Sequence, residues 1–216
     1  LLIRKHGVGT FVNERMLNDS WNMAEREHAA NLGAVLAHEI APPGVPAYIV
    51  DPVSVDEFDA VARVAGLPGI ERRSLSHALN LKATARRAAQ ALGQPYDSIN
   101  LVIAHMGGGI SVSAQRRGRM VDVNQALDGT GPFSPERAGG LPVGDVLRLA
   151  YSGRYSYEEL FALISRQGGL LAHLGTNDAR AVEARISEGD SHAELIYRAM
   201  AYQIAKEIGL MATVLL

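Results

Sequence analysis

The sequence contains no cysteine among its 216 residues. Disulfide bonds and thiolate metal sites are therefore excluded, and the composition suits a reducing compartment. Excess positive charge is also missing: the formal net charge is −2, which argues against a basic field for nucleic acid. The sequence shows neither an apolar run of roughly 18–20 residues nor a signal peptide. We expect a globular, cytoplasmic protein with no membrane or nucleic-acid partner.

The two ends of the sequence look interrupted. The chain begins at Leu1 rather than at a methionine, and it stops in the apolar run LMATVLL at 210–216. That run lacks the Gly, Asn or Pro that commonly closes a helix. We therefore interpret the chain as a piece of a longer protein.

Apolar runs and alternation predict strands in the first half of the chain. A short strand is expected at 9–13, and a buried one at 45–53, where VPAYIVDPV is rich in β-forming residues. Another buried strand is expected at 99–106. Residues 110–123 alternate around Arg-Arg-Gly-Arg, which predicts a β-hairpin.

Helical spacing accounts for most of the remaining chain. Helices are expected at 24–40, 55–65 and 71–92, the last ending at Gly93, and from Val143 onward. The last helix has a clear apolar face. Two helix starts carry the capping-box spacing of Ser and Glu three residues apart: Ser156 with Glu159, and Ser191 with Glu194. Strands followed by helices, with one hairpin, indicate an α/β fold.

Three glycines in HMGGGIS, at 105–111, stand where the predicted strand ends and a turn begins. Glycine there allows positive φ and lets backbone N–H groups approach a ligand, and such groups suit phosphate oxygens. The pattern is neither G-x-G-x-x-G nor the Walker form, and a hairpin follows instead of a helix, which disfavours a dinucleotide-binding oxidoreductase. A tight turn without a ligand remains the alternative.

Three histidines lie near apolar or loop segments: His28, His77 and His105. They lack the spacing of a zinc site, and a lone histidine often has a structural role. His105 is the strongest functional candidate, because it leads directly into the glycines.

Two charged residues are further candidates. Asp51 closes a predicted strand, where a carboxylate faces the ligand crevice of an α/β fold or forms an Asx turn. Arg137 lies in the Gly/Pro-rich SPERAGG and could clamp a phosphate or carboxylate through two hydrogen bonds. A surface ion pair with Glu136 or Asp128 is the alternative for Arg137.

Taken together, several stretches resemble butyrate kinases, which belong with the acetate kinases to the superfamily of sugar kinases, heat-shock 70 ATPases and actin. The resemblance covers nearly the whole chain, and LDGTGPFSPERAGGLPVGD at 127–145 is its most specific part. The other stretches are EHAANLG, VPAYIVDPV, ERRSLSHALN, VIAHMGGGISV, GGLLAHLGTNDAR and MAYQIAKEIGLMATVL. The resemblance implies an incomplete form of a fold with two ribonuclease-H-like lobes. Residues 1–52 would be a remnant of the first lobe and 53–216 most of the second.

The resemblance also implies an activity. The γ-phosphoryl group of ATP, with Mg²⁺, would pass reversibly to butyrate or a similar short- or branched-chain carboxylate, giving an acyl phosphate. The protein would be a homodimer. The nucleotide phosphates would contact His105, Gly107, Gly108, Gly109 and Ser111.

The catalytic assignments come from the same resemblance. Arg137 and His77 would stabilise the transferring phosphoryl group, and Asp51 would order the site, directly or through Mg²⁺. His28 and Asn31 match a segment on the substrate side.

The chain departs from the family pattern in two ways. The first phosphate-binding hairpin and a substrate-side arginine would precede Leu1, and the adenosine-binding and late acidic residues would follow Leu216. We therefore expect no competent kinase from this chain alone. Ser76 stands where members usually carry Phe, before His77. If this position lines the acyl pocket, serine would favour longer or branched acids.

Two alternatives to a kinase fragment remain. One is a non-catalytic remnant that acts only in self-association. The other is an actin- or chaperone-like ATPase, which is disfavoured because the matching loops belong to the acid kinase branch.

Overall fold

A computed structural model describes residues 10–21, 32–127 and 129–216. The chain divides into two compact units, and the division passes through strands of one sheet. The first unit comprises Leu1–Asn100 and Gln115–Asp122, and the second comprises Leu101–Ala114 and Val123–Leu216. Each is described by itself. The lobe boundary expected near residue 52 stays a prediction.

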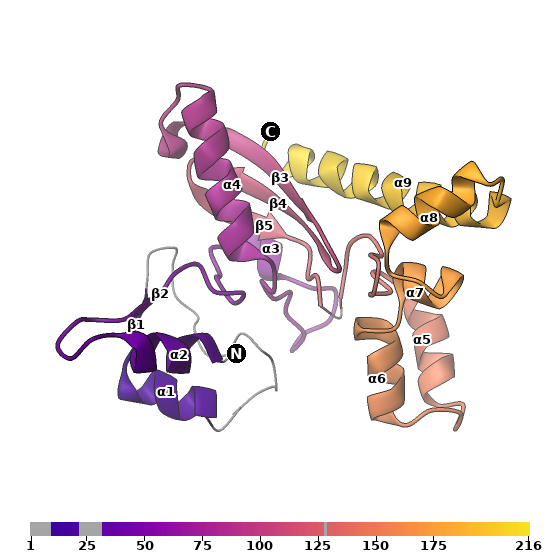
Figure 1. The fold of residues 1–216 in the computed structure, drawn as a ribbon, viewed down its shortest axis with the longest axis horizontal. Coiled ribbons are helices and arrows are strands. Elements are labelled where there is room, and N and C mark those ends of the chain that lie inside the picture. Colours follow the sequence, from indigo (N-terminus) through magenta and orange to yellow (C-terminus); the bar gives the residue numbers. More distant parts are fainter. Residues whose placement is uncertain (1–9, 22–31, 128) are drawn as a thin grey trace. The chain divides into compact units, whose positions relative to one another are not determined.

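The first unit begins with two very short strands and two helices (Figure 1). Strand β1 (Thr10–Phe11) pairs antiparallel with β2 (Tyr48–Ile49). Helix α1 (Glu14–Trp21) packs on α2 (Leu32–Ile40). A small apolar core joins these elements, and its buried members are Val12, Met16 and Ala34.

The strand expected at 9–13 is confirmed as β1, and the helix expected to end before the prolines ends at Ile40. The buried strand expected at 45–53 is wrong in length and burial. Only two of its residues pair, and Tyr48 and Val50 are 54% and 49% exposed. Among the described residues, the only strand that pairs with β2 is β1, which is also two residues long.

The helices expected at 55–65 and 71–92 are much shorter in the structure. Helix α3 covers only Ala60–Arg63, and α4 covers Ala78–Ala91. The backbone N–H of Asp59 donates to Val121 O at 3.1 Å, which holds the preceding segment extended against a distant strand. Helix α4 does end as expected, because Gly93 takes the left-handed conformation with φ of 64°.

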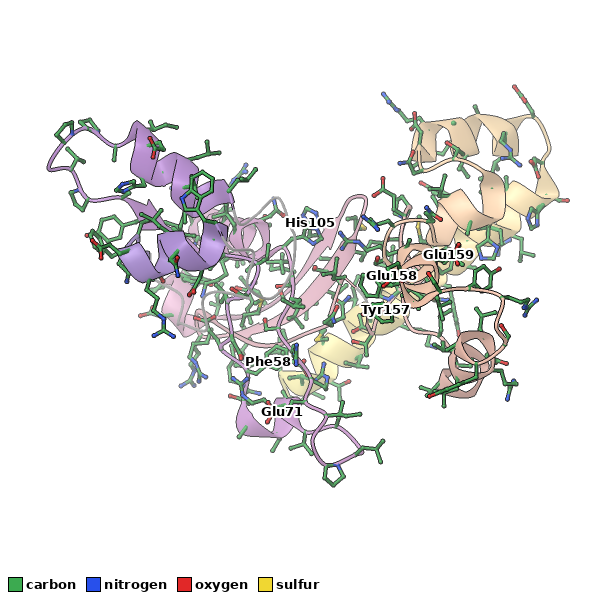
Figure 2. All side chains as sticks on the ribbon, turned by 90° about the horizontal axis from the view of Figure 1, so that it is seen from below. Phe58, Glu71, His105, Tyr157, Glu158 and Glu159 are labelled. Carbon is green, nitrogen blue, oxygen red and sulfur yellow. The ribbon has the colours of Figure 1, made fainter. Side chains whose placement is uncertain are left out.

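Residues 71–77 remain outside α4 because their backbone pairs with other segments. Val64 and Glu71 form an isolated antiparallel bridge, and Ser76 N donates to Val53 O at 3.1 Å. The guanidinium carbons of Arg63 and Arg72 lie 5.8 and 5.5 Å from the ring centroid of Phe58, which Figure 2 labels together with Glu71. These cation–π contacts thus hold Phe58, in the extended segment before α3, against Arg63 and Arg72.

A short 3₁₀ turn, η2 (Tyr96–Ser98), leads into the expected sheet. The strands are β3 (Asn100–Met106), β4 (Ile110–Arg116) and β5 (Arg119–Val123), in the order β3-β4-β5. Both the strand expected at 99–106 and the hairpin are confirmed.

The hairpin turn has positive φ at both central residues, 49° at Arg117 and 80° at Gly118. This is the pattern of a two-residue type I′ turn, whose twist suits antiparallel strands. The Arg-Gly pair at the tip therefore sets the register of β4 and β5.

The second unit contributes the remaining helices, of which α7 and α8 both contact α9 (Figure 1). Among the described residues, no helix has the length and apolar character that crossing a bilayer requires. The helices are α5 (Val143–Ala150), α6 (Tyr157–Ser165), α7 (Gly169–Leu174), α8 (Ala179–Ser187) and α9 (Ser191–Val214).

One of the two expected capping boxes is present. Ser156 Oγ accepts from Glu159 N at 3.2 Å, and Glu159 Oε2 accepts from Ser156 N at 2.7 Å, at the start of α6 (Figure 2). The box expected at Ser191 is wrong. Helix α9 is capped one residue earlier, by Asp190, whose Oδ1 accepts from Ala193 N at 2.9 Å. An aspartate caps as well as a serine and also pairs here with Arg185.

Candidate functional site

Glycines 107–109, here called the glycine turn, follow β3 directly. Gly107 N donates to Gly109 O at 3.1 Å. Neither Gly107 nor Gly108 takes the left-handed conformation, so the positive φ expected from the sequence is not the reason for these two glycines. A Cβ on Gly107 would lie 3.1 Å from His105 Nε2, tighter than nine in ten real Cβ contacts, so the imidazole would have to shift slightly to admit it.

Residues 124–140, here called the arginine loop, hold the glycine turn from one side. Gly108 O accepts a hydrogen bond from Ser134 Oγ at 2.6 Å and another from Glu136 N at 3.3 Å. A Cβ on Gly108 would lie 3.3 Å from Glu136 Oε2. The two Gly-rich segments of the sequence therefore form one structure.

Within the arginine loop, Ser134 and Arg137 define a tight turn. Ser134 N donates to Arg137 O at 3.0 Å, while Arg137 N donates to Ser134 Oγ at 3.1 Å. The guanidinium group of Arg137 donates to Ala126 O through Nη1 at 2.5 Å. Glu136, one of the expected ion-pair partners, accepts instead from Asn177 Nδ2 at 2.6 Å, and Asp128 lies outside the described residues.

Gly168 and Gly169, at the start of α7, support the arginine loop from behind. Gly168 N donates to Glu136 O at 2.9 Å, and Leu170 N donates to Ser134 O at 3.2 Å. Gly169 has φ of 60°, and a Cβ there would collide with Ser134 O. The sequence stretch GGLLAHLGTNDAR includes this pair, but no role in supporting the arginine loop was predicted for it.

Asn124 joins the start of the arginine loop to β4. Its buried side chain accepts from Val112 N at 2.6 Å and donates to Ile110 O at 3.0 Å and Thr130 O at 3.3 Å. No role was predicted for Asn124 from the sequence either. An amide that ends an alternating strand offers both a donor and an acceptor for extending backbone pairing.

His105 stands near the end of β3 (Figure 2). Burial lowers the pKa of its imidazole below the ordinary value, so the ring is neutral near pH 7. A neutral imidazole offers a hydrogen bond to a ligand rather than a fixed positive charge. Ser111, two residues after the glycine turn, is fully buried in β4.

Asp51, in the first unit, occupies an unusual position. Its backbone has φ of 43°, and its side chain is fully buried. Oδ2 pairs with Arg86 Nη1 at 3.0 Å, whereas Oδ1 has no hydrogen-bond partner among the described residues. An orphaned, buried carboxylate oxygen costs free energy unless something compensates it, and a bound cation would do so. This residue therefore fits Mg²⁺.

Ser76 and His77 lie beside the segment that follows Asp51, since Ser76 N donates to Val53 O at 3.1 Å. The Ser76 side chain is buried, with Oγ 4.0 Å from Met120 Sδ. His77 is the N-cap residue of α4, but its side chain makes no capping hydrogen bond.

The predicted site residues thus fall into two groups, one in each unit. Asp51, Ser76 and His77 belong to the first unit, while His28 and Asn31 lie outside the described residues. No group of three or more His, Asp or Glu side chains that could share a metal occurs in the described part of the chain. The residues of the second unit are His105, Gly107, Gly108, Gly109, Ser111 and Arg137.

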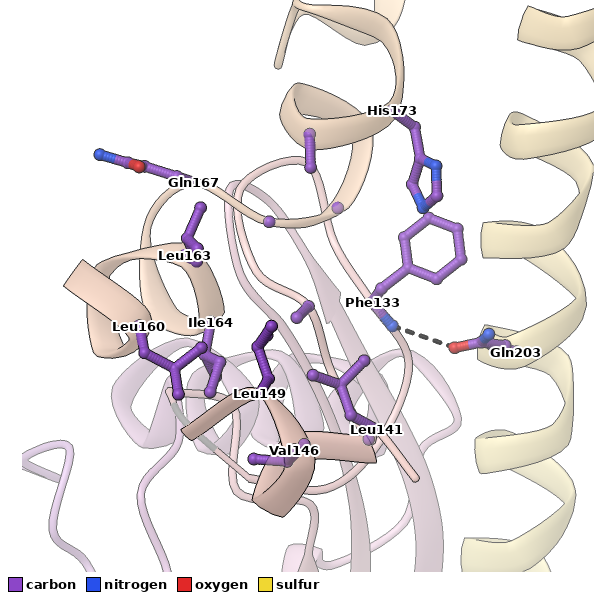
Figure 3. Close-up of a pocket in the computed structure, with 15 residues that line it drawn as sticks. Phe133, Leu141, Val146, Leu149, Leu160, Leu163, Ile164, Gln167, His173 and Gln203 are labelled. Atoms are coloured by element: carbon purple, nitrogen blue, oxygen red, sulfur yellow. Dashed lines mark hydrogen bonds between the residues drawn. The ribbon is translucent and has the colours of Figure 1, made fainter. Parts of the chain in front are cut away.

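An apolar cavity of about 360 Å³ lies behind the arginine loop, within the second unit (Figure 3). Leu149 from α5 and Leu160 from α6 line it, together with Ala138 of the loop itself. Phe133 N donates to Gln203 Oε1 at 3.2 Å on its far wall. Ala138, the residue after Arg137, therefore borders a partly empty apolar cavity.

A family model and several solved structures match this chain. A model of the Acetokinase family matches residues 68–216. The structure of Porphyromonas gingivalis acetate kinase superimposes with a TM-score of 0.82 at 24% identity, covering 98% of this chain and 56% of that chain. A propionate kinase from Francisella tularensis subsp. tularensis SCHU S4 gives 0.77 at 22% identity, covering 98% and 59%. Acetate kinase from Entamoeba histolytica gives 0.76 at 16%, covering 94% and 55%.

The expected α/β fold is confirmed by these structures. The chain spans little more than half the length of each of them.

Proposed function

The chain belongs to the acetokinase family, and from that premise we propose that it carries part of a carboxylate kinase. The reaction is reversible transfer of the γ-phosphoryl group of ATP to a short-chain carboxylate, which yields an acyl phosphate. The observation that carries the proposal is the glycine turn clamped by the arginine loop through Gly108 O. This arrangement brings bare backbone and a guanidinium-bearing loop into one place.

The glycine turn suits phosphate oxygens. Without side chains at Gly107 and Gly108, an anionic ligand can approach the backbone closely. His105, held neutral by burial, can donate one hydrogen bond there without adding charge. These residues are assigned to the nucleotide phosphates.

Arg137 is assigned to the transferring phosphoryl group. Phosphoryl transfer needs little covalent help from the protein, and positioning plus charge stabilisation supply most of the rate enhancement. Ser134 forms hydrogen bonds with both the backbone N and the backbone O of Arg137, so the Arg137 side chain extends from a fixed main chain. The acceptor carboxylate is already ionised near neutral pH, so no general base is required.

Asp51 and His77 are assigned to the same reaction. Mg²⁺, when bound, would neutralise charge on the nucleotide phosphates. Asp51 Oδ1 is the oxygen that fits the metal, because Arg86 already occupies Oδ2. His77 would also stabilise the phosphoryl group, and His28 and Asn31 would bind on the carboxylate side.

Butyrate or a similar branched acid is the substrate we propose. The resemblance of 127–145 to butyrate kinases supports it, while the matched family includes acetate kinases. Ser76 supports it in a second way, because serine is much smaller than the phenylalanine that the resembled family usually carries at this position, which is buried here. A homodimer is also expected, and sedimentation velocity would test it.

Hydroxylamine trapping of acyl phosphate tests the function. The chain receives Mg-ATP with acetate, propionate, butyrate or isobutyrate in separate reactions. From this chain alone we expect no signal, because the resemblance places part of the phosphate-binding machinery outside it. In a chain extended by the family's segments at both ends, we expect a signal that is strongest with the four-carbon acids and is lost in Arg137→Ala. Arg166→Ala is the matched control, because Arg166 is an exposed arginine of the same unit. Silence with every acid from such an extended chain, shown by circular dichroism to be folded, would favour the non-catalytic, self-associating alternative.

A further inference from the structure

We propose that Glu136 makes the glycine turn selective for nucleotide phosphates that carry a divalent cation. The inference rests on the proposed function, because it takes the glycine turn as a phosphate site. Its basis is the position of a carboxylate directly beside Gly108 of that turn.

Glu136 lies directly against the turn. Its backbone N donates to Gly108 O at 3.3 Å, and its Oε2 would lie 3.3 Å from a Cβ on Gly108. The carboxylate therefore occupies the space beside the bare α-carbon. The same glycine that lets a phosphate approach the backbone also lets Glu136 approach it.

The carboxylate is held at this position from two directions. Asn177 Nδ2 donates to Oε1 at 2.6 Å, and Gly168 N donates to the backbone carbonyl of Glu136 at 2.9 Å. Glu136 therefore has its main chain fixed at N and O and its side chain tied at one oxygen. The other oxygen, Oε2, is the one that faces Gly108.

A fixed carboxylate beside a phosphate-binding turn repels a bare polyphosphate. At a separation of about 4 Å near a protein surface, repulsion between two unit charges weakens binding by roughly tenfold or more. A divalent cation reverses the sign, because Mg²⁺ binds carboxylate and phosphate oxygens together and retains several waters. The turn would thus accept Mg-nucleotide and reject the free nucleotide.

Calorimetric titration of the chain with ATP tests this, once with excess Mg²⁺ and once with EDTA. The wild-type chain should bind at least about tenfold more tightly with Mg²⁺ than with EDTA. Glu136→Gln keeps the shape and the acceptor for Asn177 but removes the charge. It should narrow this ratio by strengthening binding in EDTA. Glu158→Gln, an exposed glutamate of the same unit, is the control and should leave the ratio unchanged (Figure 2).

A second variant guards against a folding defect in the first. Asn177→Ala frees the carboxylate without touching the backbone bonds to Gly108, and it should narrow the ratio in the same direction. A wild-type ratio near one, or a large ratio that neither variant changes, overturns the role of Glu136 while the phosphate site stands. Absence of ATP binding in both conditions by every folded variant overturns the phosphate site and this inference together.

Discussion

Replacing Lys82 with methionine should strongly destabilise the first unit. Lys82 is 2% exposed, and its Nζ lies 2.8 Å from both carboxylate oxygens of Glu57. Glu57 is 8% exposed, and its Oε2 also accepts from Met120 N at 2.8 Å. The ion pair therefore ties α4 to an extended segment and to β5. Removing the ammonium leaves a buried carboxylate with no compensating charge from Lys82.

The expected loss is large. Breaking one partner of a buried pair costs about 3–5 kcal/mol in the free energy of unfolding. Glu57 keeps its hydrogen bond from Met120 N, so we expect the lower end, about 3 kcal/mol. The double variant Lys82→Met with Glu57→Gln retains an acceptor for Met120 N and buries no charge. It should recover most of the loss and lie within about 1 kcal/mol of the wild type.

Urea unfolding followed by far-UV circular dichroism at pH 7 provides the measurement. Arg15→Met is the control, because Arg15 pairs with Asp19 on the surface of α1 at 3.9 Å with its side chain 91% exposed. Such a pair contributes about 0–1 kcal/mol. A Lys82→Met loss no larger than that of the control would refute the reasoning. So would a double variant less stable than Lys82→Met alone.

Two further predictions concern Gly169 and Tyr96. Gly169→Ala should lower the melting temperature much more than Gly153→Ala does. Both glycines have positive φ, but an added Cβ would meet Ser134 O at Gly169 and open space at Gly153. Equal shifts in differential scanning calorimetry would show that backbone conformation alone matters. Burial raises the pKa of Tyr96 to about 12, so its stabilising contribution is present below pH 10 and is lost as the pH rises toward 12. In an absorbance titration at alkaline pH, Tyr96→Phe should remove the latest tyrosine step, and an unchanged titration would contradict the assignment.

Local pattern predicted the elements whose geometry depends on neighbours in sequence. The hairpin of β4 and β5 is such a case, because alternation and the Arg117–Gly118 turn are both local. Ser156 and Glu159 form their capping box for the same reason, since both partners lie within one helical turn. Gly93 ends α4 through its own left-handed backbone.

The predictions are wrong where another residue or segment competes successfully with the local conformational preference. Residues 55–59 have a helical pattern, but Asp59 N pairs with Val121 O, more than sixty positions away. Ser191 was displaced as the cap of α9 by the residue before it, whose carboxylate both caps and pairs with Arg185. No window of local sequence contains the first of these partners.

The candidate site was predicted in part for a related reason. The glycine turn and Arg137 stood out by composition, but their contact through Ser134 and Gly108 joins positions 26 residues apart. Gly168 and Gly169 act on the same loop from still further along the chain. Their role depends on close approach between backbones, which leaves no periodic signal.

The abundance of glycine around the site is therefore a matter of contact rather than of mobility. Gly108, Gly168 and Gly169 each stand where a side chain would press on the arginine loop, and backbone hydrogen bonds join Glu136 of that loop to Gly108 and to Gly168. Stabilising charge in a transition state requires donors that are already in place before the reaction. Three backbone segments packed without intervening side chains give Arg137 and Glu136 such a foundation. We therefore expect a single methyl group at Gly169 to perturb the loop that carries both charges.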